Sequence, residues 1–291
     1  MTAERARLRA LRHQARQRTR IEQRQREAAQ RERARRNQGR LERCLCNPPQ
    51  IADRLPFGPG EELGYVISIG GIYAGRVDLK IGASESLTDH LVYPATAHAD
   101  TNSFFSKMSK VEGHQTSYFT PEGVIPLTMF ARSHLGDVQR DESASFDIQR
   151  HTADATLVYP KREWRGTVEG GAPIQDVLSV VYFARSRELA EGQDYCVELY
   201  YGKRLWVVRG RVVGRELVST PAGPYRALKI TGEAARDGLP ALVRPLTVWI
   251  SQDDDRLPLQ LTSPSAYGEI EVKIDQFRRG RRLVHDVSAL R

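Results

Sequence analysis

Short runs of alternating apolar and polar residues dominate the chain from residue 55 onward. Successive side chains on a β-strand point to opposite faces, so such a run predicts a strand with one buried and one wet face. The two strictest runs lie near the C-terminal end, and we expect their apolar members to share one interior. These members are Leu257, Leu259, Leu261, Ile270, Val272 and Ile274.

The clearest hairpin joins the runs Glu62–Ile69 and Ile72–Ile81 through Gly70-Gly71. Glycine accepts the positive φ that two-residue hairpin turns require. The apolar parity of the second run switches at Gly75, which predicts a β-bulge there. Further strands are expected at Leu91–Ala99, Gln115–Phe119, Leu127–Ser133, Asp137–Ile148, Ala155–Tyr159, Lys203–Val213, Tyr225–Thr231 and Leu246–Ser251.

One segment, Asp176–Arg185, has helical instead of alternating spacing, with Asp176 as its N-cap. Its faces are apolar nearly all round, which is typical of a buried helix and not of a surface helix. Many short strands and one helix predict an all-β fold, an antiparallel barrel-like or strongly curved wrapped sheet. The short helix should plug one end of it or line one wall.

Charge divides the chain into unequal parts. Residues 1–43 hold 15 Arg and 5 Glu, a net charge of +10, whereas the whole chain carries +8. These residues predict a helical or disordered arm, because they contain too few apolar side chains to join a core. We expect a linker over 44–54, a single all-β domain over 55–278 and a basic tail over 279–291. The domain itself is near neutral, so the high pI does not make it a nucleic-acid-binding domain.

Motifs for chemistry are absent from the sequence. There is no GxSxG, P-loop, HExxH or serine-lysine pair at catalytic spacing, so we assign no catalytic residue, no metal ligand and no cofactor. Consecutive Asp253, Asp254 and Asp255 lack calcium-loop spacing and favour a solvated hairpin tip. Cys44 and Cys46 are too close for an easy disulfide, and Cys196 is expected to be a buried thiol. The histidines, expected to be scattered on the surface, are His13, His90, His98, His114, His134, His151 and His285.

Arg209 and Arg211 lie on the strand face away from Trp206 and Val208, and we expect both arginines to meet solvent or a partner. No run of apolar residues is long enough to predict a transmembrane helix. No apolar core typical of a secretory signal is visible near the start of the sequence.

A series of short motifs resembles a bacterial family catalogued as domain of unknown function 3108. The motifs cover residues 55–278 and occur in family order. They are Leu55-Pro56-Phe57-Gly58-Pro59-Gly60-Glu61, Gly70-Gly71-Ile72-Tyr73-Ala74-Gly75, Gln175-Asp176-Val177-Leu178-Ser179 with Tyr182 and Arg185, Gly214-Arg215-Glu216, Thr220-Pro221-Ala222-Gly223, Trp249-Ile250-Ser251-Gln252-Asp253-Asp254 with Leu257-Pro258, and Tyr267-Gly268-Glu269-Ile270. The resemblance implies a β-barrel-like fold on proteins exported to the periplasm or outer membrane, with no known catalytic residues.

Three functions follow as hypotheses. The first is a non-enzymatic cell-envelope protein that binds an apolar or glycan ligand or an assembly partner. The second is an envelope hydrolase or transferase with a dispersed site. The third is a cytoplasmic protein that binds nucleic acid through residues 1–43. An apolar interior pocket favours the first, and a pocket with a histidine beside a carboxylate favours the second.

Overall fold

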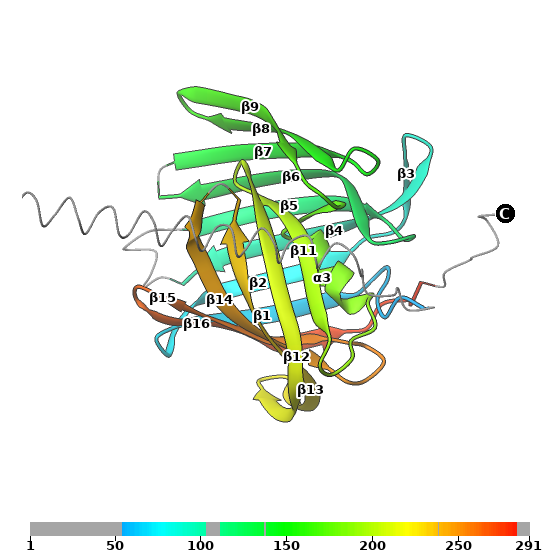
Figure 1. Cartoon of the computed structure of the whole chain (residues 1–291), viewed down its shortest axis with the longest axis vertical. Helices are drawn as coiled ribbons and strands as arrows, with labels where there is room; N and C mark the ends of the chain where they lie inside the picture. Colours follow the sequence, from blue (N-terminus) through cyan, green and yellow to red (C-terminus); the bar gives the residue numbers. More distant parts are fainter. Residues whose placement is uncertain (1–53, 103–110, 137, 238, 284–291) are drawn as a thin grey trace, which may run out of the picture.

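The computed structural model describes residues 54–102, 111–136, 138–237 and 239–283. The expected arm over 1–43 and nearly all of the linker lie outside this part, together with Cys44, Cys46, His13 and His285. The described chain forms one large sheet and one short helix (Figure 1). The all-β, barrel-like prediction is therefore confirmed.

The sheet has 16 strands, and their neighbours along it are antiparallel except for β10 and β11. The strands are β1 (Glu62–Ile69), β2 (Ile72–Ile81), β3 (Glu85–Leu87), β4 (His90–Thr101), β5 (Val111–Thr120), β6 (Ile125–Leu135), β7 (Val138–Asp147), β8 (Thr152–Tyr159), β9 (Arg162–Glu169), β10 (Ile174–Asp176), β11 (Asp194–Tyr201), β12 (Arg204–Thr220), β13 (Gly223–Arg236), β14 (Leu239–Ser251), β15 (Pro258–Ser265) and β16 (Gly268–Arg278). The helix is α3 (Ser179–Arg185).

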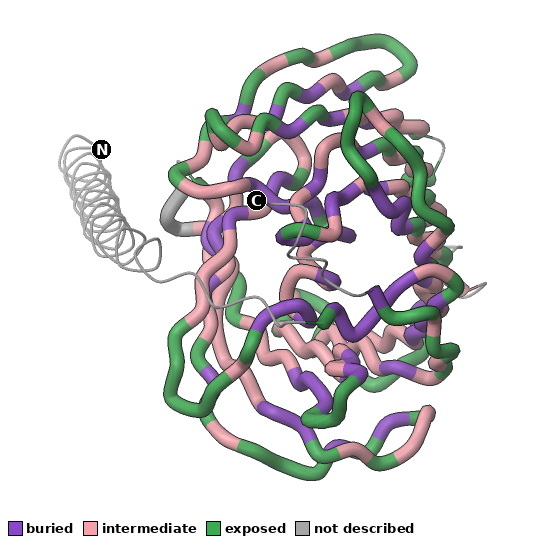
Figure 2. Tube along the Cα trace, turned by 90° about the vertical axis from the view of Figure 1, so that its right-hand side faces the viewer, coloured by how far each residue is buried: buried purple, intermediate pink, exposed green. Residues whose placement is uncertain are grey.

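The sheet curls round without closing into a barrel. Its order runs from β10 and β11 through β16, β1 and β2 to β8 and β9, and the two end strands do not pair. Instead the ends overlap: side chains of β10, β11 and β12 pack against those of β6 to β9 in one apolar cluster. Seen along the sheet in Figure 2, the chain runs round a ring with buried segments on its inner side.

The predicted β1–β2 hairpin and its bulge are confirmed. Gly70 and Gly71 form the turn with φ of 58° and 81°. Opposite the step from Ile67 to Ser68 the pairing on β2 moves from Gly75 to Tyr73, so the extra residue is Ala74, next to the predicted position. A Cβ on Gly75 would lie 2.1 Å from the Asp100 carbonyl oxygen, so only glycine allows this approach of β4.

The six alternating residues near the C-terminal end face inward as predicted. Leu257, Leu259 and Ile274 are fully buried. Leu261, Ile270 and Val272 are partly buried, and none of the six is exposed. The period-2 pattern therefore identified the buried face of β15 and β16.

A second cluster of buried residues fills the end of the sheet that holds α3. It includes Phe57, Phe119 and Tyr182, whose rings pack with centroids 5.0 to 6.2 Å apart. Residues 279–283, expected as part of a basic tail, lie against this end. The backbone N–H of Leu283 donates to the Phe57 carbonyl at 3.2 Å, and its side chain is buried.

The helix is buried as predicted, with no exposed residue, but its predicted start was wrong. The helix begins at Ser179, because Ile174–Asp176 pairs with β11 as strand β10. Two of its three buried residues, Ser179 and Arg185, are polar, while Val177 just before it is 42% exposed. These polar side chains can be buried because they have buried partners, Asp176 for Ser179 and Glu61 for Arg185.

The prediction for Arg209 was also wrong, whereas Arg211 is exposed as expected. Arg209 is buried and its Nη1 lies 3.6 Å from Glu233 Oε1. On β12 the face that holds Arg209 also holds Leu205 and Val207, which the overlap of the sheet ends buries. Alternation alone could not show that both faces of β12 are covered there.

Because Leu259 is fully buried, Leu259→Ala should lower the free energy of unfolding by about 2–5 kcal/mol. The matched control is Leu217→Ala on β12, since Leu217 is 73% exposed and should change stability little. Urea unfolding followed by circular dichroism measures both. Equal effects of the two substitutions would contradict the assigned interior.

Candidate functional site

An apolar pocket of about 400 Å³ lies inside the curved sheet, next to α3. Its walls come from β1, β2, β4, β5, β6, β7, β15 and β16, and the start of α3 closes one side. Among the lining side chains are Tyr65, Ile67, Val77, Leu79, Ala97, Ala99, Ala131, Val177, Leu178, Val181, Pro258, Leu261 and Val272. A small volume and a mostly apolar lining are typical of sites for small apolar ligands.

The pocket exists because the inward-facing residues change in size along the strands. Near α3 the inner positions of β4 and β5 hold Tyr93 and Phe119, which are buried in the core. Further along the same strands the inner positions hold Ala97, Ala99 and Gly113. Small side chains at these positions leave the space that aromatic rings fill at the other end.

Polar groups in the lining are few. Gln115, Ser133, Arg132 and Arg140 line the pocket, and the two arginines are paired with Asp141 and Glu142, at 2.6 and 2.9 Å. The lining contains His114 and no carboxylate. This composition suits the burial of an apolar body with a few hydrogen bonds.

Asp176 determines where the wall formed by α3 begins. Its Oδ1 accepts the backbone N–H of Leu178 at 2.8 Å and of Ser179 at 3.0 Å. In return Ser179 Oγ accepts the backbone N–H of Asp176 at 2.9 Å. This reciprocal pair resembles a capping box, and it satisfies backbone donors that the first turn of a helix leaves free.

The same carboxylate joins β10, at one end of the sheet, to β5, which lies four strands from the other end. Gln115 Nε2 donates to Asp176 Oδ1 at 2.8 Å, and Ser117 Oγ donates to Oδ2 at 2.5 Å. Both donors lie on β5, so Asp176 holds β10 against the inner face of the opposite part of the sheet. Burial raises the pKa of Asp176, while the bonds from Ser117, Ser179 and Leu178 act in the opposite direction.

A second buried polar contact fixes the other end of α3. Arg185 and Glu61 are fully buried and form a two-armed ion pair with distances of 2.6 and 2.8 Å. Arg185 Nη2 also donates to the Asp255 carbonyl at 3.0 Å. Removing one member of such a pair leaves a buried charge without its partner, which costs several kcal/mol. The helix is therefore held to β1 and to the β14–β15 turn.

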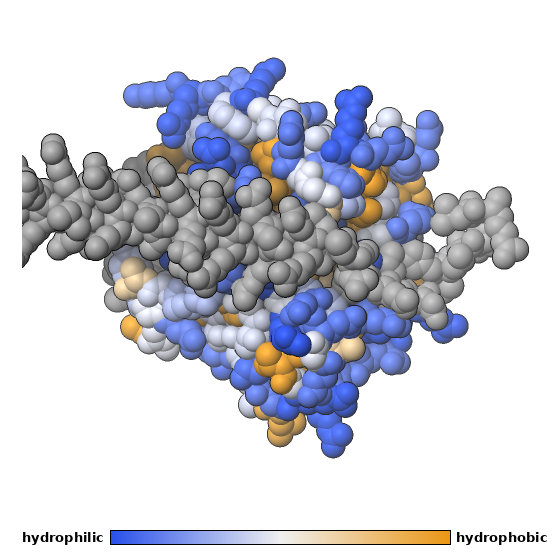
Figure 3. Space-filling model, in the orientation of Figure 1, coloured by the Kyte–Doolittle hydropathy of each residue, from blue (hydrophilic) through white to orange (hydrophobic). Residues whose placement is uncertain are grey.

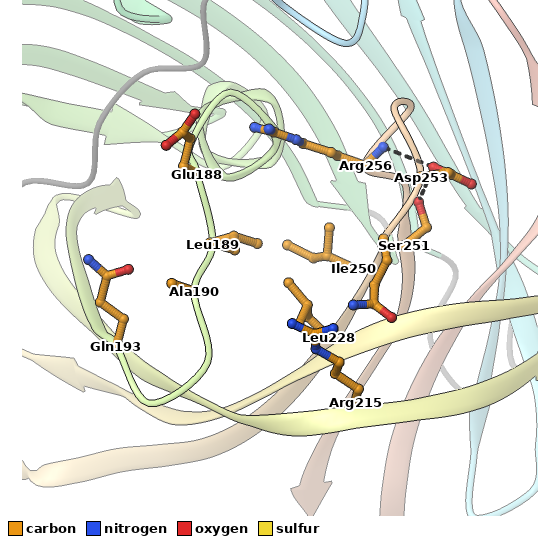
Figure 4. A pocket seen from close by; sticks show the side chains of 11 residues that line it. Glu188, Leu189, Ala190, Gln193, Arg215, Leu228, Ile250, Ser251, Asp253 and Arg256 are labelled. Carbon is orange, nitrogen blue, oxygen red and sulfur yellow. Dashed lines mark hydrogen bonds between the residues drawn. The ribbon is translucent and has the colours of Figure 1, made fainter.

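A separate, more polar pocket of about 450 Å³ lies between the segment after α3 and strands β12 to β14 (Figure 4). Leu189 points toward Ile250 across it, and Glu188 and Arg256 lie at one side. Ser251 Oγ donates to Asp253 Oδ1 at 2.7 Å, and the backbone N–H of Arg256 donates to the same oxygen at 3.2 Å. These carboxylate contacts stabilise the β14–β15 turn, and no histidine is among the residues that line this pocket.

The predicted solvated tip over Asp253–Asp255 is confirmed only for its first two residues. Asp255 is buried and bonds to Arg279 and Arg282, with Arg282 Nη2 at 2.9 Å. Burial pushes the pKa of Asp255 upward, but the two arginines outweigh it and the pKa lies below its usual range. This aspartate anchors the segment after β16 instead of facing solvent.

The histidines are less scattered than expected. His98 and His114 face each other on β4 and β5, with ring centroids 4.2 Å apart and Nδ1 atoms 3.2 Å apart. Within the described residues, no group of three or more His, Cys, Asp or Glu side chains could hold a metal ion. Cys196 is partly exposed instead of buried.

The family comparison decides the relationship of this chain. Residues 64–275 match the family described as "Protein of unknown function (DUF3108)". The chain belongs to this family. The resemblance noted in the sequence is confirmed, and no curated protein matches the chain.

The fold of this DUF3108 protein is shared by a solved structure of TM-score above 0.5, and two further structures are less similar. A β-barrel-like protein of domain of unknown function DUF1849 from Brucella abortus has a TM-score of 0.53 at 10% identity, over 77% of this chain and 99% of that chain. A candidate exported protein with a YmcC-like fold from Bacteroides fragilis has a TM-score of 0.36 at 8% identity, over 78% and 100% of the two chains. A candidate lipoprotein from Parabacteroides distasonis has a TM-score of 0.33 at 8% identity, over the same shares.

Within its described part, the chain has no helix that is both long and apolar enough to span a membrane.

Asp176→Ala should lower the free energy of unfolding by roughly 3 kcal/mol or more, because it leaves three buried donors and the half-buried Gln115 amide without an acceptor. Asp176→Asn keeps an acceptor oxygen for these donors and should stay within about 1 kcal/mol of the wild type.

The stability that Asp176 contributes should depend on pH. Because its pKa is raised in the folded state, Asp176 contributes most stability below its unfolded pKa of about 3.9, and this contribution is lost as the pH rises through the folded-state pKa. The Asn variant should therefore gain stability relative to the wild type with increasing pH.

Urea unfolding at several pH values measures these differences. Asp254→Ala is the control, since the Asp254 side chain is 89% exposed and its one ion pair lies at 3.5 Å. If Asp176→Ala unfolds at the same urea concentration as Asp254→Ala, then other contacts hold the sheet ends together.

Proposed function

We propose that this protein is a non-enzymatic binding protein of the cell envelope whose interior pocket takes a small apolar ligand or the apolar part of a larger one. The observation that carries the proposal is the pocket beside α3, with its apolar lining from eight strands and the helix. Burying apolar surface contributes roughly 25 cal/mol per Å², so a ligand that fills the pocket gains affinity without charged contacts.

The distribution of polar groups supports binding over chemistry. The lining of this pocket contains no carboxylate, and the imidazole of His114 stacks on His98. His114 also lines a neighbouring pocket with Asp141 and Glu142, but these two carboxylates are paired with Arg132 and Arg140. The buried carboxylates near α3, Glu61 and Asp176, are each bonded to structural partners. Nucleophilic or acid–base catalysis needs such groups beside the substrate.

An acyl chain or another apolar hydrocarbon is the ligand class that this pocket suits best. A glycan needs several free hydrogen-bonding groups. The lining holds five polar side chains among many apolar ones, but both arginines are already paired with carboxylates and His114 stacks on His98. The envelope is part of the proposal because the family resemblance implies exported proteins, and lipids are the abundant acyl compounds there.

Ala97→Phe tests the pocket, because Ala97 lies in its wall on β4 and a phenyl ring would occupy its space. Binding of the apolar fluorophore N-phenylnaphthylamine should weaken about tenfold or more, which corresponds to about 1.4 kcal/mol. The matched control is Thr96→Phe, since Thr96 is the exposed neighbour on the opposite face of the same strand. Fluorescence titration measures both affinities.

Unchanged binding in Ala97→Phe, or an equal loss in Thr96→Phe, would contradict the assignment of this pocket. A wild-type protein that does not bind the fluorophore would contradict the proposed function itself.

A further inference from the structure

Most hairpin turns of the sheet lie at the same ends of the strands, on one side of the molecule. Because neighbouring strands alternate in direction, the β1–β2, β6–β7, β8–β9, β11–β12 and β15–β16 turns all lie on this side, which we name the hairpin end. The helix α3 lies toward the opposite end. In Figure 1 the β1–β2 and β15–β16 turns form the left-hand edge of the molecule.

Large apolar side chains are exposed at the tips of four of these hairpins. Tyr267 is 83% exposed and Leu135 61% exposed. Figure 3 shows apolar side chains among hydrophilic ones at the left-hand edge. The exposed apolar residues of the hairpin end are Ile72, Tyr73, Leu135, Val138, Tyr201 and Tyr267.

Cations without acidic partners lie beside these tips. Lys161 and Arg162 are on the β8–β9 turn, and Lys203 and Arg204 are on the β11–β12 turn; none of the four has an ion pair with a described carboxylate. Arg162 and Lys203 both lie over the Tyr159 ring, at 4.6 and 5.1 Å from its centroid.

Few carboxylates lie close to these four cations. The nearest in sequence to these cations, Glu163, is paired with Arg165. Glu269 is on another hairpin. Asp237 lies beside the start of β12, where its backbone N–H donates to the Leu205 carbonyl at 2.9 Å, so it is one carboxylate near four cations. The β8–β9 and β11–β12 side of the hairpin end is therefore locally cationic.

We propose that the hairpin end docks on a lipid surface that contains anionic headgroups. Separate apolar tips suit a fluid bilayer, because each tip can insert by itself between the lipids. A protein partner needs one continuous packed patch of roughly 800 Å² on each side. Tyrosine is favoured where one side of a residue is apolar and the other is wet, and Lys and Arg near the surface are attracted by anionic lipids.

Docking at this end also fits the position of the pocket. The pocket lining extends from Leu178 and Val181 of the helix region toward the hairpin end, where it includes Ile67, Ala99 and Ser133. A lipid surface at the hairpin end would place an acyl chain close to the pocket. In this respect the inference rests on the proposed function, although docking itself does not require a filled pocket.

Vesicle flotation with the full chain tests the docking. On phosphatidylcholine vesicles, which offer no net charge to the Arg-rich residues 1–43, Leu135→Ser/Tyr267→Ser should reduce the bound fraction about tenfold. The matched control is Leu91→Ser/Leu217→Ser, because both leucines are exposed and lie toward the opposite end. It should float like the wild type.

Phosphatidylglycerol in the vesicles tests the charge component. Lys161→Gln/Lys203→Gln should lower binding to these vesicles at low salt and leave binding to phosphatidylcholine unchanged. Comparing variants of the same full chain cancels the contribution of residues 1–43.

Equal flotation of the two serine double variants, or a wild type that floats with neither lipid mixture, would overturn the inference. The inference would also be overturned if the wild type self-associates and Leu135→Ser/Tyr267→Ser abolishes this self-association, which would assign the hairpin end to a second copy of the chain.

Ala97→Phe separates the docking proposal from the pocket proposal, because this variant should no longer bind the fluorophore but should still float with the vesicles. Normal flotation of a wild type that binds no fluorophore contradicts the pocket alone.

Discussion

A sheet that curls without closing needs side chains to hold its facing parts together, and here the buried carboxylate of Asp176 joins β10, at one end, to β5 on the facing part. A closed barrel joins its first and last strands by backbone hydrogen bonds, which removes both edges. In this sheet β9 and β10 do not pair. Instead, Asp176 at the inner end accepts bonds from Gln115 and Ser117 on the opposite side of the curl. The apolar contacts among β6 to β12 then bury the overlap.

The same carboxylate connects the overlap to the pocket. By accepting the backbone N–H groups of Leu178 and Ser179, Asp176 ends β10 and starts α3. The ion pair between Arg185 and Glu61 holds the far end of the helix to β1. With both ends fixed, α3 forms one wall of a space that the small residues on β4 leave unfilled. The pocket is thus a consequence of how the sheet is closed.

The strands of the fold could be predicted from the sequence because they follow local rules. Gly70-Gly71 requires a turn, and the alternation around Leu259 and Ile274 requires a buried face. Strand β9 was not predicted, because Arg162, Glu163 and Arg165 make its pattern polar. Charged residues are typical of exposed edge strands, which they protect against pairing with other chains. Its identity depends on its neighbour β8, and no local pattern carries that information.

The residues that organise the site were harder to predict for the same reason. The sequence identified Asp176 as a helix cap, but its bonds to β5 join residues about 60 positions apart. Burial of Arg209 likewise depends on the overlap of the sheet ends. The pocket depends on alanines, which resemble ordinary strand residues until the strands around them are placed. Only the family motif that contains Gln175-Asp176 hinted at a special role for this segment.

Amide hydrogen exchange of β10 and the start of α3 tests the account most directly. If Asp176 locks the overlapping ends, then the backbone N–H groups of Asp176, Leu178 and Ser179 should exchange only through global unfolding, as slowly as those of β1 and β16. If these amides exchange through a local opening while β1 and β16 remain protected, the ends of the sheet separate in the native protein. The pocket beside α3 would then not be a fixed feature of the fold, and the account would be contradicted.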